Sequence, residues 1–180
     1  MKYMFASDVH GSAYYCRKML DVYKEEKAER LVLLGDLLYH GPRNDLPKEY
    51  APKQVISMLN DMKKEIYAVR GNCEAEVDQM VLQFPVMADY CILNLDGRTF
   101  YATHGHIYNE NNLPPIQEGD ILIHGHTHVL KAEQKEGYVL LTPCFFPFQK
   151  EETPPTYAIF EDGVFTIKDF EGNIVKSIEL

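Results

Sequence analysis

Seven side chains of types that bind metal ions stand in five short motifs, and each motif follows an apolar run. They are Asp8 and His10 in Ser7-Asp8-Val9-His10, Asp36 in Gly35-Asp36, Asn72 in Gly71-Asn72, His104 in Thr103-His104-Gly105-His106, and His126 and His128 in Gly125-His126-Thr127-His128. Seven ligands are too many for one ion, whereas two divalent ions that share a carboxylate would use them all. Two ions held about 3.5–4 Å apart can stabilise both the attacking and the leaving oxygen of a phosphoryl transfer. The motifs therefore predict a paired-metal site.

Each motif also has an ordinary structural interpretation. Taken alone, Asp36 is a turn residue, and Asp8 is the N-cap of the helix that follows it. The pair His126 and His128 would be a polar loop. We favour the metal site because the ordinary interpretation would have to hold at five separate strand ends. Carboxylate, carboxamide and imidazole ligands suit manganese, iron or zinc, and a magnesium site rarely takes so many histidines.

The first half of the chain alternates predicted strands and helices. Short apolar runs predict strands at 3–6, 31–34 and 66–69, and apolar residues at helical spacing predict helices at 12–26, from 52 onwards and at 75–82. Ser12 is a suitable N-cap for the first helix, and Pro52 suits the first position of the second. Strand–helix–strand units favour parallel pairing, so we expect the first motifs to meet at one edge of a sheet.

The second half of the chain is richer in strands. Turn signals at Asp96-Gly97, Glu136-Gly137 and Asp162-Gly163 predict three pairs of strands, the first of them 90–95 with 98–103. Residues 121–123 predict a buried strand that ends at His124, and a last strand follows Gly172-Asn173. The expected fold is a mixed-sheet α/β sandwich, with the five motifs at the carboxyl ends of strands, where such folds place their sites.

The composition limits the function classes. A chain of 180 residues favours one domain, 1–180, which is large enough to fold without a disulfide or a structural zinc. The formal net charge of −9 and the absence of a basic stripe argue against a nucleic-acid polymer or an anionic membrane as partner. Four cysteines without CxxC spacing, no signal peptide and no apolar run of roughly 20 residues predict a cytoplasmic protein.

The order of the five motifs resembles that of the calcineurin-like metallophosphoesterases. The resemblance extends from Asp8 to His128. Longer stretches are similar to the small bacterial YfcE-type phosphodiesterases: Gly41-Pro42-Arg43-Asn44, Tyr50-Ala51-Pro52, Val69-Arg70-Gly71-Asn72-Cys73 and Glu76-Val77-Asp78-Gln79-Met80. The resemblance implies an αββα sandwich of two mixed sheets flanked by helices. It also implies a metal-dependent phosphodiesterase that hydrolyses a small phosphodiester by attack of a bridging hydroxide.

The resemblance further implies how the ligands divide between two ions. One ion would be held by Asp8, His10, Asp36 and His128, and the second by Asp36, Asn72, His104 and His126. Asp36 would bridge the two. Members of this family commonly use manganese, so we expect two Mn²⁺ ions, with Zn²⁺, Fe²⁺ or Ni²⁺ as alternatives.

Four further residues are candidates for catalytic work: Cys73, His106, His40 and Arg43. Many relatives carry a histidine after Gly-Asn as proton donor, where this chain has Cys73. A thiol with a pKa of about 8.5 is a poorer acid than imidazole near neutrality, and its other interpretation is a small packing residue. His106 is expected to line the pocket, and His40 is either near the site or simply a polar loop residue. Arg43 is either a phosphate clamp or a solvated loop arginine.

Other functions remain open from the sequence. A phosphomonoesterase of the same fold is one alternative, and a non-catalytic interaction scaffold is another, because the retromer scaffold subunit resembles this fold. A scaffold has no need of all seven ligands, and a nuclease should show a basic track for the nucleic-acid backbone. The apolar run Cys144-Phe145-Phe146-Pro147-Phe148 is core by default, with a pocket wall or the contact surface of a homo-oligomer as alternatives.

Overall fold

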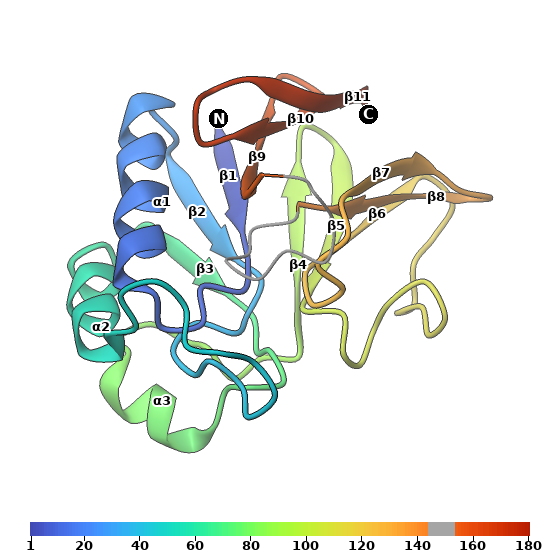
Figure 1. The fold of residues 1–180 in the computed structure, drawn as a ribbon. Coiled ribbons are helices and arrows are strands. Elements are labelled where there is room, and N and C mark those ends of the chain that lie inside the picture. The colour runs from blue at the N-terminus through green and yellow to red at the C-terminus, as the bar shows by residue number, and fades with distance from the viewer. Residues whose placement is uncertain (144–153) are drawn as a thin grey trace.

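The computed structural model describes residues 1–143 and 154–180, and it contains two β-sheets (Figure 1). Six strands form the first sheet: β1 (Tyr3–Ala6), β2 (Arg30–Leu33), β3 (Ile66–Ala68), β9 (Thr156–Glu161), β10 (Val164–Asp169) and β11 (Ile174–Glu179). Their order across the sheet is β11-β10-β9-β1-β2-β3. The pairs β1–β2 and β2–β3 are parallel, as strand–helix–strand units predict, whereas β9 runs antiparallel to β1.

Five strands form the second sheet: β4 (Tyr90–Leu95), β5 (Arg98–Thr103), β6 (Asp120–His124), β7 (Lys131–Gln134) and β8 (Tyr138–Thr142). The order is β4-β5-β6-β8-β7. The hairpin strands β4 and β5 are antiparallel, β6 lies parallel to both β5 and β8, and β7 pairs antiparallel with β8. Both sheets are therefore mixed. The predicted turns at Asp96-Gly97, Glu136-Gly137 and Asp162-Gly163 each connect an antiparallel pair.

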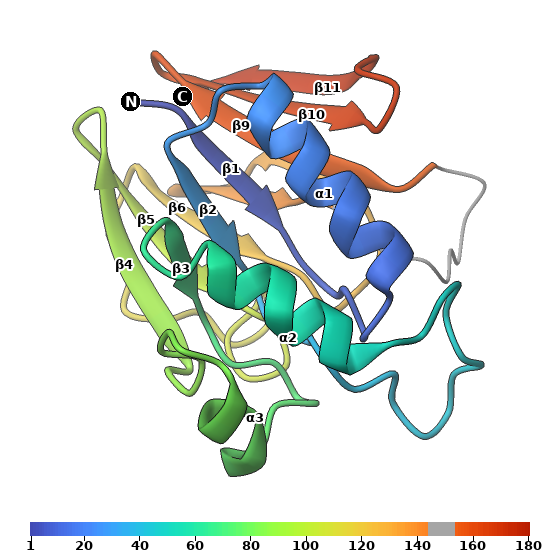
Figure 2. The ribbon, with the colours of Figure 1, turned by 90° about the vertical axis from the view of Figure 1, so that its left-hand side faces the viewer.

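Three helices are described: α1 (Ala13–Glu25), α2 (Pro52–Asp61) and α3 (Glu76–Val81). Ser12 caps α1, because its side chain accepts a hydrogen bond from the N–H of Tyr15, and Pro52 occupies the first turn of α2. The helices α1 and α2 lie over the first sheet (Figure 2). Among the described helices, none is long and apolar enough to cross a membrane.

Successive side chains of β1 point to opposite faces of the first sheet, so the strand contributes to two hydrophobic cores. Met4 and Ala6 pack toward the helices, whereas Phe5 packs between the sheets. The ring of Phe5 lies 6.1 Å from that of Phe100 in the second sheet and 5.8 Å from that of Phe165. Because both faces of β1 are covered, its apolar run is continuous, which is typical of a central strand.

The outer face of the second sheet is covered differently. Tyr101, Leu122, Tyr138 and Leu140 form a small cluster there, and Ile116, from the segment between β5 and β6, packs against it. The hydroxyl of Tyr101 donates to the carbonyl of Pro115 at 3.1 Å. The expected class, two mixed sheets with flanking helices, is confirmed, with this irregular segment packed on the outer face of the second sheet. The run Cys144–Phe148 lies outside the described residues.

Candidate metal centre

The loops that follow five strands bring all seven predicted ligands together. Asp8 and His10 follow β1, Asp36 follows β2, Asn72 follows β3, His104 follows β5, and His126 and His128 follow β6. The first three strands belong to one sheet and the last two to the other. The site therefore forms where the carboxyl ends of strands from both sheets meet, as parallel pairing predicts.

The first group of ligands, Asp8, His10, Asp36 and His128, is named here the first ligand set. His10 Nε2 lies 3.6 Å from Asp8 Oδ1 and 3.6 Å from Asp36 Oδ2. His128 Nε2 lies 4.0 Å from the same oxygen of Asp8. Asp8 and His10 are almost completely buried. The donor atoms of Asp8, His10 and His128 lie within 4.8 Å of one another, close enough to surround one ion.

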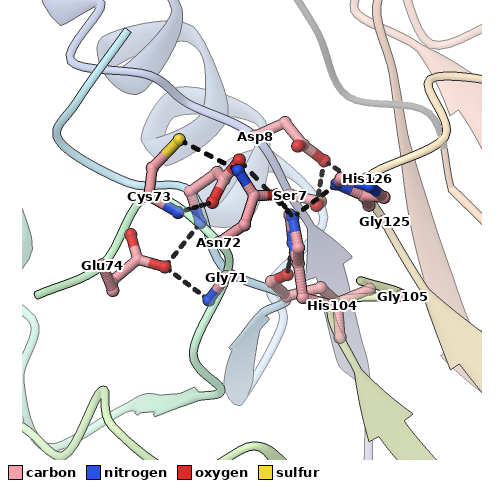
Figure 3. Close-up of polar contacts among 12 residues, drawn as sticks. Ser7, Asp8, Gly71, Asn72, Cys73, Glu74, His104, Gly105, Gly125 and His126 are labelled. Atoms are coloured by element: carbon pink, nitrogen blue, oxygen red, sulfur yellow. Dashed lines mark hydrogen bonds and ion pairs between the residues drawn. The ribbon is translucent and has the colours of Figure 1, made fainter. Parts of the chain in front are cut away.

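The second ligand set, Asp36, Asn72, His104 and His126, is more closely spaced around His104. Its Nε2 atom lies 3.0 Å from Asn72 Oδ1, 3.2 Å from His126 Nδ1 and 3.4 Å from Asp36 Oδ2 (Figure 3). Asp36 Oδ2 therefore belongs to both sets. The clusters Asp8-His10-His128 and Asp36-His104-His126 each fall within one of the two expected sets, and the assignment of the ligands to two ions stays a prediction.

In Asp8 and in Asp36, one carboxylate oxygen accepts hydrogen bonds from the protein and the other faces the histidine ligands. Asp8 Oδ2 accepts hydrogen bonds from the hydroxyl of Ser7 and, at 3.2 Å, from the N–H of His126. Asp8 Oδ1 is buried and has no hydrogen-bond partner among the described residues. Asp36 Oδ1 accepts from the N–H of Cys73 at 2.8 Å. In both residues one oxygen is held by the protein while the other faces the histidines, which is an arrangement suited to a cation.

Backbone carbonyls fix the orientation of two ligand histidines. Tyr39 O lies 2.7 Å from His10 Nδ1, and Leu34 O lies 2.7 Å from His104 Nδ1. A carbonyl only accepts, so each Nδ1 carries the proton and each Nε2 presents its lone pair to the carboxylates when the ring is neutral. Second hydrogen bonds of this kind are typical of metal-binding histidines. The residues thus fit divalent metal ions in donor type, spacing and orientation.

The charges of the cluster act on one another. Burial alone would raise the pKa of Asp8 and Asp36, but neighbouring histidines lower the pKa of both carboxyl groups. Burial alone would lower the pKa of His104, but Asp36 and Asp8 raise it to about 9. In the absence of metal, His104 therefore carries a proton at neutral pH. A metal ion that binds its Nε2 atom must displace that proton.

The backbone is strained at the ligands. Five of the seven have positive φ angles: Asp8 (58°), His10 (49°), Asp36 (56°), His126 (63°) and His128 (57°). Few non-glycine residues adopt this left-handed region, and each instance costs on the order of 1 kcal/mol. Such strain persists where the surroundings impose it, and it gathers at functional sites.

Glu74 positions two ligand loops and was not identified from the sequence. Its buried carboxylate accepts hydrogen bonds from the N–H groups of Asp36 (2.8 Å), Leu37 (2.7 Å) and Gly71 (2.6 Å). Gly71 must be glycine, because a Cβ atom there would lie 2.1 Å from Asp36 Oδ1. The available signal was that Glu74 follows Asn72 by only two residues, in a loop too short to place a carboxylate far from the site.

A second supporting network was also missed. His124 is fully buried, and its Nε2 lies 3.2 Å from Glu110 Oε2. Lys131 donates to the other oxygen of Glu110 at 2.5 Å. Gly105, beside the ligand His104, lies against the His124 ring, since a Cβ atom there would come within 2.7 Å of it. The sequence gives no spacing rule that pairs residues so far apart.

The four remaining candidates occupy different places. Arg43 and Cys73 line a pocket of about 450 Å³, the metal pocket, together with ligands of both sets. His106, which was expected to line the pocket, is not among its lining residues; its ring lies 5.3 Å from that of His104 and 6.3 Å from that of His126. His40 is packed edge-on between the rings of Tyr39 and Tyr50, at 4.8 and 5.2 Å.

Comparison with known proteins agrees with the geometry. The family model described as "Calcineurin-like phosphoesterase superfamily domain" matches residues 1–162. The chain is 41% identical over 167 residues to Phosphodiesterase YfcE of Escherichia coli strain K12, covering 93% of this chain and 91% of that protein. It is 23% identical to Phosphodiesterase MJ0936 of Methanocaldococcus jannaschii over 79% of this chain and 82% of that protein.

Solved structures give the same result. The structure of the E. coli phosphoesterase YfcE superposes with a TM-score of 0.96 at 38% identity, covering 99% of each chain. Wild-type Vps29 from Entamoeba histolytica, complexed with Zn²⁺, superposes with a TM-score of 0.58 at 17% identity, again over 99% of each chain. The second likeness is one of fold alone.

Proposed function

Because the chain belongs to the calcineurin-like phosphoesterase superfamily, we propose that it hydrolyses a small phosphodiester with the help of two divalent metal ions. Membership of the family and 41% identity to Phosphodiesterase YfcE make the chain a phosphoric diester hydrolase. The single observation that supports paired ions is the position of Asp36 Oδ2. It lies 3.6 Å from His10 Nε2 in the first ligand set and 3.4 Å from His104 Nε2 in the second.

The proposed ligands of one ion are Asp8, His10, Asp36 and His128, and those of the other are Asp36, Asn72, His104 and His126. Manganese is the preferred ion, because it accepts carboxylate, carboxamide and imidazole together, and zinc, iron and nickel are alternatives. Bound ions would supply a hydroxide nucleophile at neutral pH and would offset charge on the phosphoryl oxygens.

The chain's own residues prepare the site for this chemistry. The carbonyls of Tyr39 and Leu34 hold His10 and His104 with their Nε2 atoms inward. Glu74 fixes the loops that carry Asp36 and Asn72. A site held in place before substrate arrives spends less binding energy on reorganisation in the transition state.

Arg43 and Cys73 are proposed to contact the substrate. Arg43 is exposed at the rim of the metal pocket, where a guanidinium can donate two parallel hydrogen bonds to phosphate oxygens. Burial and the nearby Asp36 carboxylate raise the pKa of the Cys73 thiol, so it stays protonated at neutral pH. It can donate a hydrogen bond but releases its proton reluctantly, so esters with good leaving groups should react best.

His106 and His40 are proposed to support the site without lining the metal pocket. Burial and the charge of His104 lower the pKa of His106, which keeps this imidazole neutral behind the second ligand set. His40, held between two tyrosine rings, stabilises the loop that carries the Tyr39 carbonyl.

The size and charge of the protein support a small substrate. The metal pocket, at about 450 Å³, suits a ligand of modest size. A net charge of −9 opposes the approach of polyanions, while two divalent ions would make the pocket locally positive. We also propose one domain over residues 1–180 and a cytoplasmic location, in keeping with the free thiols of Cys16, Cys73 and Cys91.

Metal removal tests this proposal. Protein treated with a chelator and verified as metal-free should not hydrolyse bis(p-nitrophenyl) phosphate, and Mn²⁺ should restore the activity, with two ions bound per chain by elemental analysis. Zn²⁺, Fe²⁺ and Ni²⁺ are added in parallel, and p-nitrophenyl phosphate serves as the monoester comparison. Full activity in the metal-free protein would disprove the metal requirement. A preference for the monoester would favour a phosphomonoesterase, and inactivity with every ion would favour a scaffold.

A further inference from the structure

A second pocket adjoins the metal pocket and differs from it in chemistry. It has a volume of about 440 Å³, and its apolar lining is formed by Leu38, Tyr39, Tyr50, Ile56, Val77 and Val81. We call it the apolar pocket. By contrast, the metal pocket is lined by metal ligands together with Arg43 and Asn44.

The two pockets are joined at Cys73, which lines both. The N–H of Cys73 donates to Asp36 Oδ1, so the residue is attached directly to the shared carboxylate of the metal centre. Tyr39, on another wall of the apolar pocket, accepts a hydrogen bond from the ligand His10 through its carbonyl oxygen. A ligand centred at the metal ions therefore has the apolar pocket as its immediate neighbour.

The apolar pocket offers few polar groups to a ligand. Its charged residues are Lys53 and Asp78, and the Asp78 carboxylate already accepts the N–H of Ala75 at the start of α3. Yet apolar side chains face water here, since Tyr39 is 41% exposed, Val77 65% and Val81 42%. Exposed apolar surface inside a concavity that borders a polar reaction centre is typical of a ligand subsite.

Resting on the proposed function, we propose that the apolar pocket binds one ester substituent of the substrate, and that this substituent is an aromatic ring or an apolar group of similar size. The phosphate would lie among the metal ligands, and the substituent would extend past Cys73. A thiol suits this position because it is small and only weakly polar. The substrate class is therefore a phosphodiester with one bulky apolar ester group, in preference to one whose substituents are both small or charged.

The test compares two phosphonates that differ only in their apolar group and that are not hydrolysed. Calorimetry on the manganese-loaded protein gives the dissociation constants of phenylphosphonate and methylphosphonate. Burial of the ring should make phenylphosphonate bind about tenfold more tightly or better. Val77→Asn and Val81→Asn should reduce this ratio toward one and leave methylphosphonate binding unchanged. Both positions are exposed, so the substitutions leave the core intact.

Met80→Asn is the matched control. Met80 lies on the same helix and is 82% exposed, but it does not line the apolar pocket. This variant should keep the wild-type ratio. Equal binding of the two phosphonates by the wild type, or an unchanged ratio in both valine variants, would overturn the inference while leaving the proposed function standing. Failure of the manganese-loaded protein to bind either phosphonate would overturn the proposed function and the inference together.

One further result would assign the exposed valines of α3 to a contact between two copies of the chain. If sedimentation shows that the wild type is a dimer, and if the valine variants and the Met80 variant all become monomers, the exposed face of α3 is a contact between two copies. A monomeric wild type, or a dimer that persists in all three variants, agrees with the substrate subsite.

Discussion

The two ligand sets share Asp36 but differ in charge and in the spacing of their donor atoms. The first set contains two carboxylates, and its donor atoms lie 3.6 to 4.0 Å apart in the structure. The second set contains one carboxylate and a carboxamide, and its donors lie 3.0 to 3.4 Å from His104 Nε2. Donors bound at about 2.1 Å to one ion lie about 3.0 Å apart in octahedral coordination and about 3.4 Å apart in tetrahedral coordination. The second set is thus near the spacing that an ion imposes, whereas the first must contract slightly.

Charge and spacing therefore favour different sets. Contraction of the first set by a few tenths of an ångström needs only small side-chain rotations. An additional carboxylate in direct contact with a dication is a larger effect, because the attraction between opposite charges at contact distance is strong in a buried site. We expect the first set to bind its ion more tightly. Donor charge is thus expected to outweigh donor spacing where the two disagree.

Asp36→Asn should have the largest effect, because it alters both sets at once. We expect kcat/KM for bis(p-nitrophenyl) phosphate to fall by on the order of 10³-fold or more, since several kcal/mol of transition-state stabilisation depend on the metals. Elemental analysis should show fewer than two ions per chain. Asp45→Asn, in an exposed loop nearby, removes the same charge and should retain both ions and activity. Near-normal activity with two ions in the Asp36 variant would remove this residue from the site.

Variants that alter only one ligand set distinguish the affinities of the two ions. Asn72→Ala should weaken only the second ion and leave one tightly bound manganese per chain, whereas His128→Ala should weaken the tight ion. Each should lower kcat/KM roughly 10²-fold, because one of two ions is lost at working concentrations. Manganese titrations of both variants measure the two affinities. Loss of the tight ion in the Asn72 variant, instead of the His128 variant, would reverse the predicted order.

The pH dependence of metal binding tests the second set through His104. Its pKa of about 9 in the metal-free protein means that a proton must leave before the ion binds. Below pH 9, the affinity of that ion should therefore fall roughly tenfold for each pH unit. Calorimetry in buffers of different ionisation enthalpy should detect one released proton at pH 7.5. No proton release would show that His104 is neutral before binding.

The same group predicts how the stability of the metal-free protein varies with pH. The interaction of His104 with Asp36 and Asp8 raises the pKa of His104 from its ordinary value of 6.5 to about 9. Its contribution to the stability of the folded protein is therefore fully present below pH 6.5 and is lost as the pH rises through 9. The Tm of the metal-free protein should fall over this range. The manganese-loaded protein is the control, because its His104 no longer holds that proton. A similar fall in both forms would assign the effect to other groups.

Cys73→His should have the smallest effect and bears on the first set, since Cys73 lies close to His10 and Asp36. An imidazole is a better proton donor near neutrality, so alkyl phosphodiesters should gain about tenfold in kcat/KM, which is less than the roughly 10²-fold of a well-placed general acid. Activated nitrophenyl esters should gain little. A series of aryl and alkyl esters measures the dependence on leaving-group pKa. Equal slopes in both proteins would make Cys73 a packing residue only.

The strand and helix pattern could be read from the sequence because each element carries its own local signal. Ser12 caps its helix, Pro52 begins another, and Asp96-Gly97 turns a hairpin, all as the local chemistry predicts. The convergence of the ligands was also predictable, because each follows a strand and parallel strands end at one edge. The division into two sets came from the resemblance to a family and stays a prediction, which the single-set variants test.

The supporting residues could not be predicted, because their roles depend on contacts between distant segments. Glu74 matters through three N–H groups that belong to two different loops. His124 and Glu110 meet only after the segment between β5 and β6 has folded against the sheet. The apolar pocket combines residues from three parts of the chain. No periodicity within one segment carries such information, because it arises from tertiary packing.

The left-handed backbone at five ligands has a consequence for protein engineering. A selection for heat resistance alone would accept glycine or asparagine at such positions, because these residues relieve the unfavourable φ angle. At His126 or His128 the same exchange would remove the imidazole donor. Such a selection should therefore leave the ligands unchanged and use Lys27 and Glu49, which share the left-handed φ and lie outside the ligand sets.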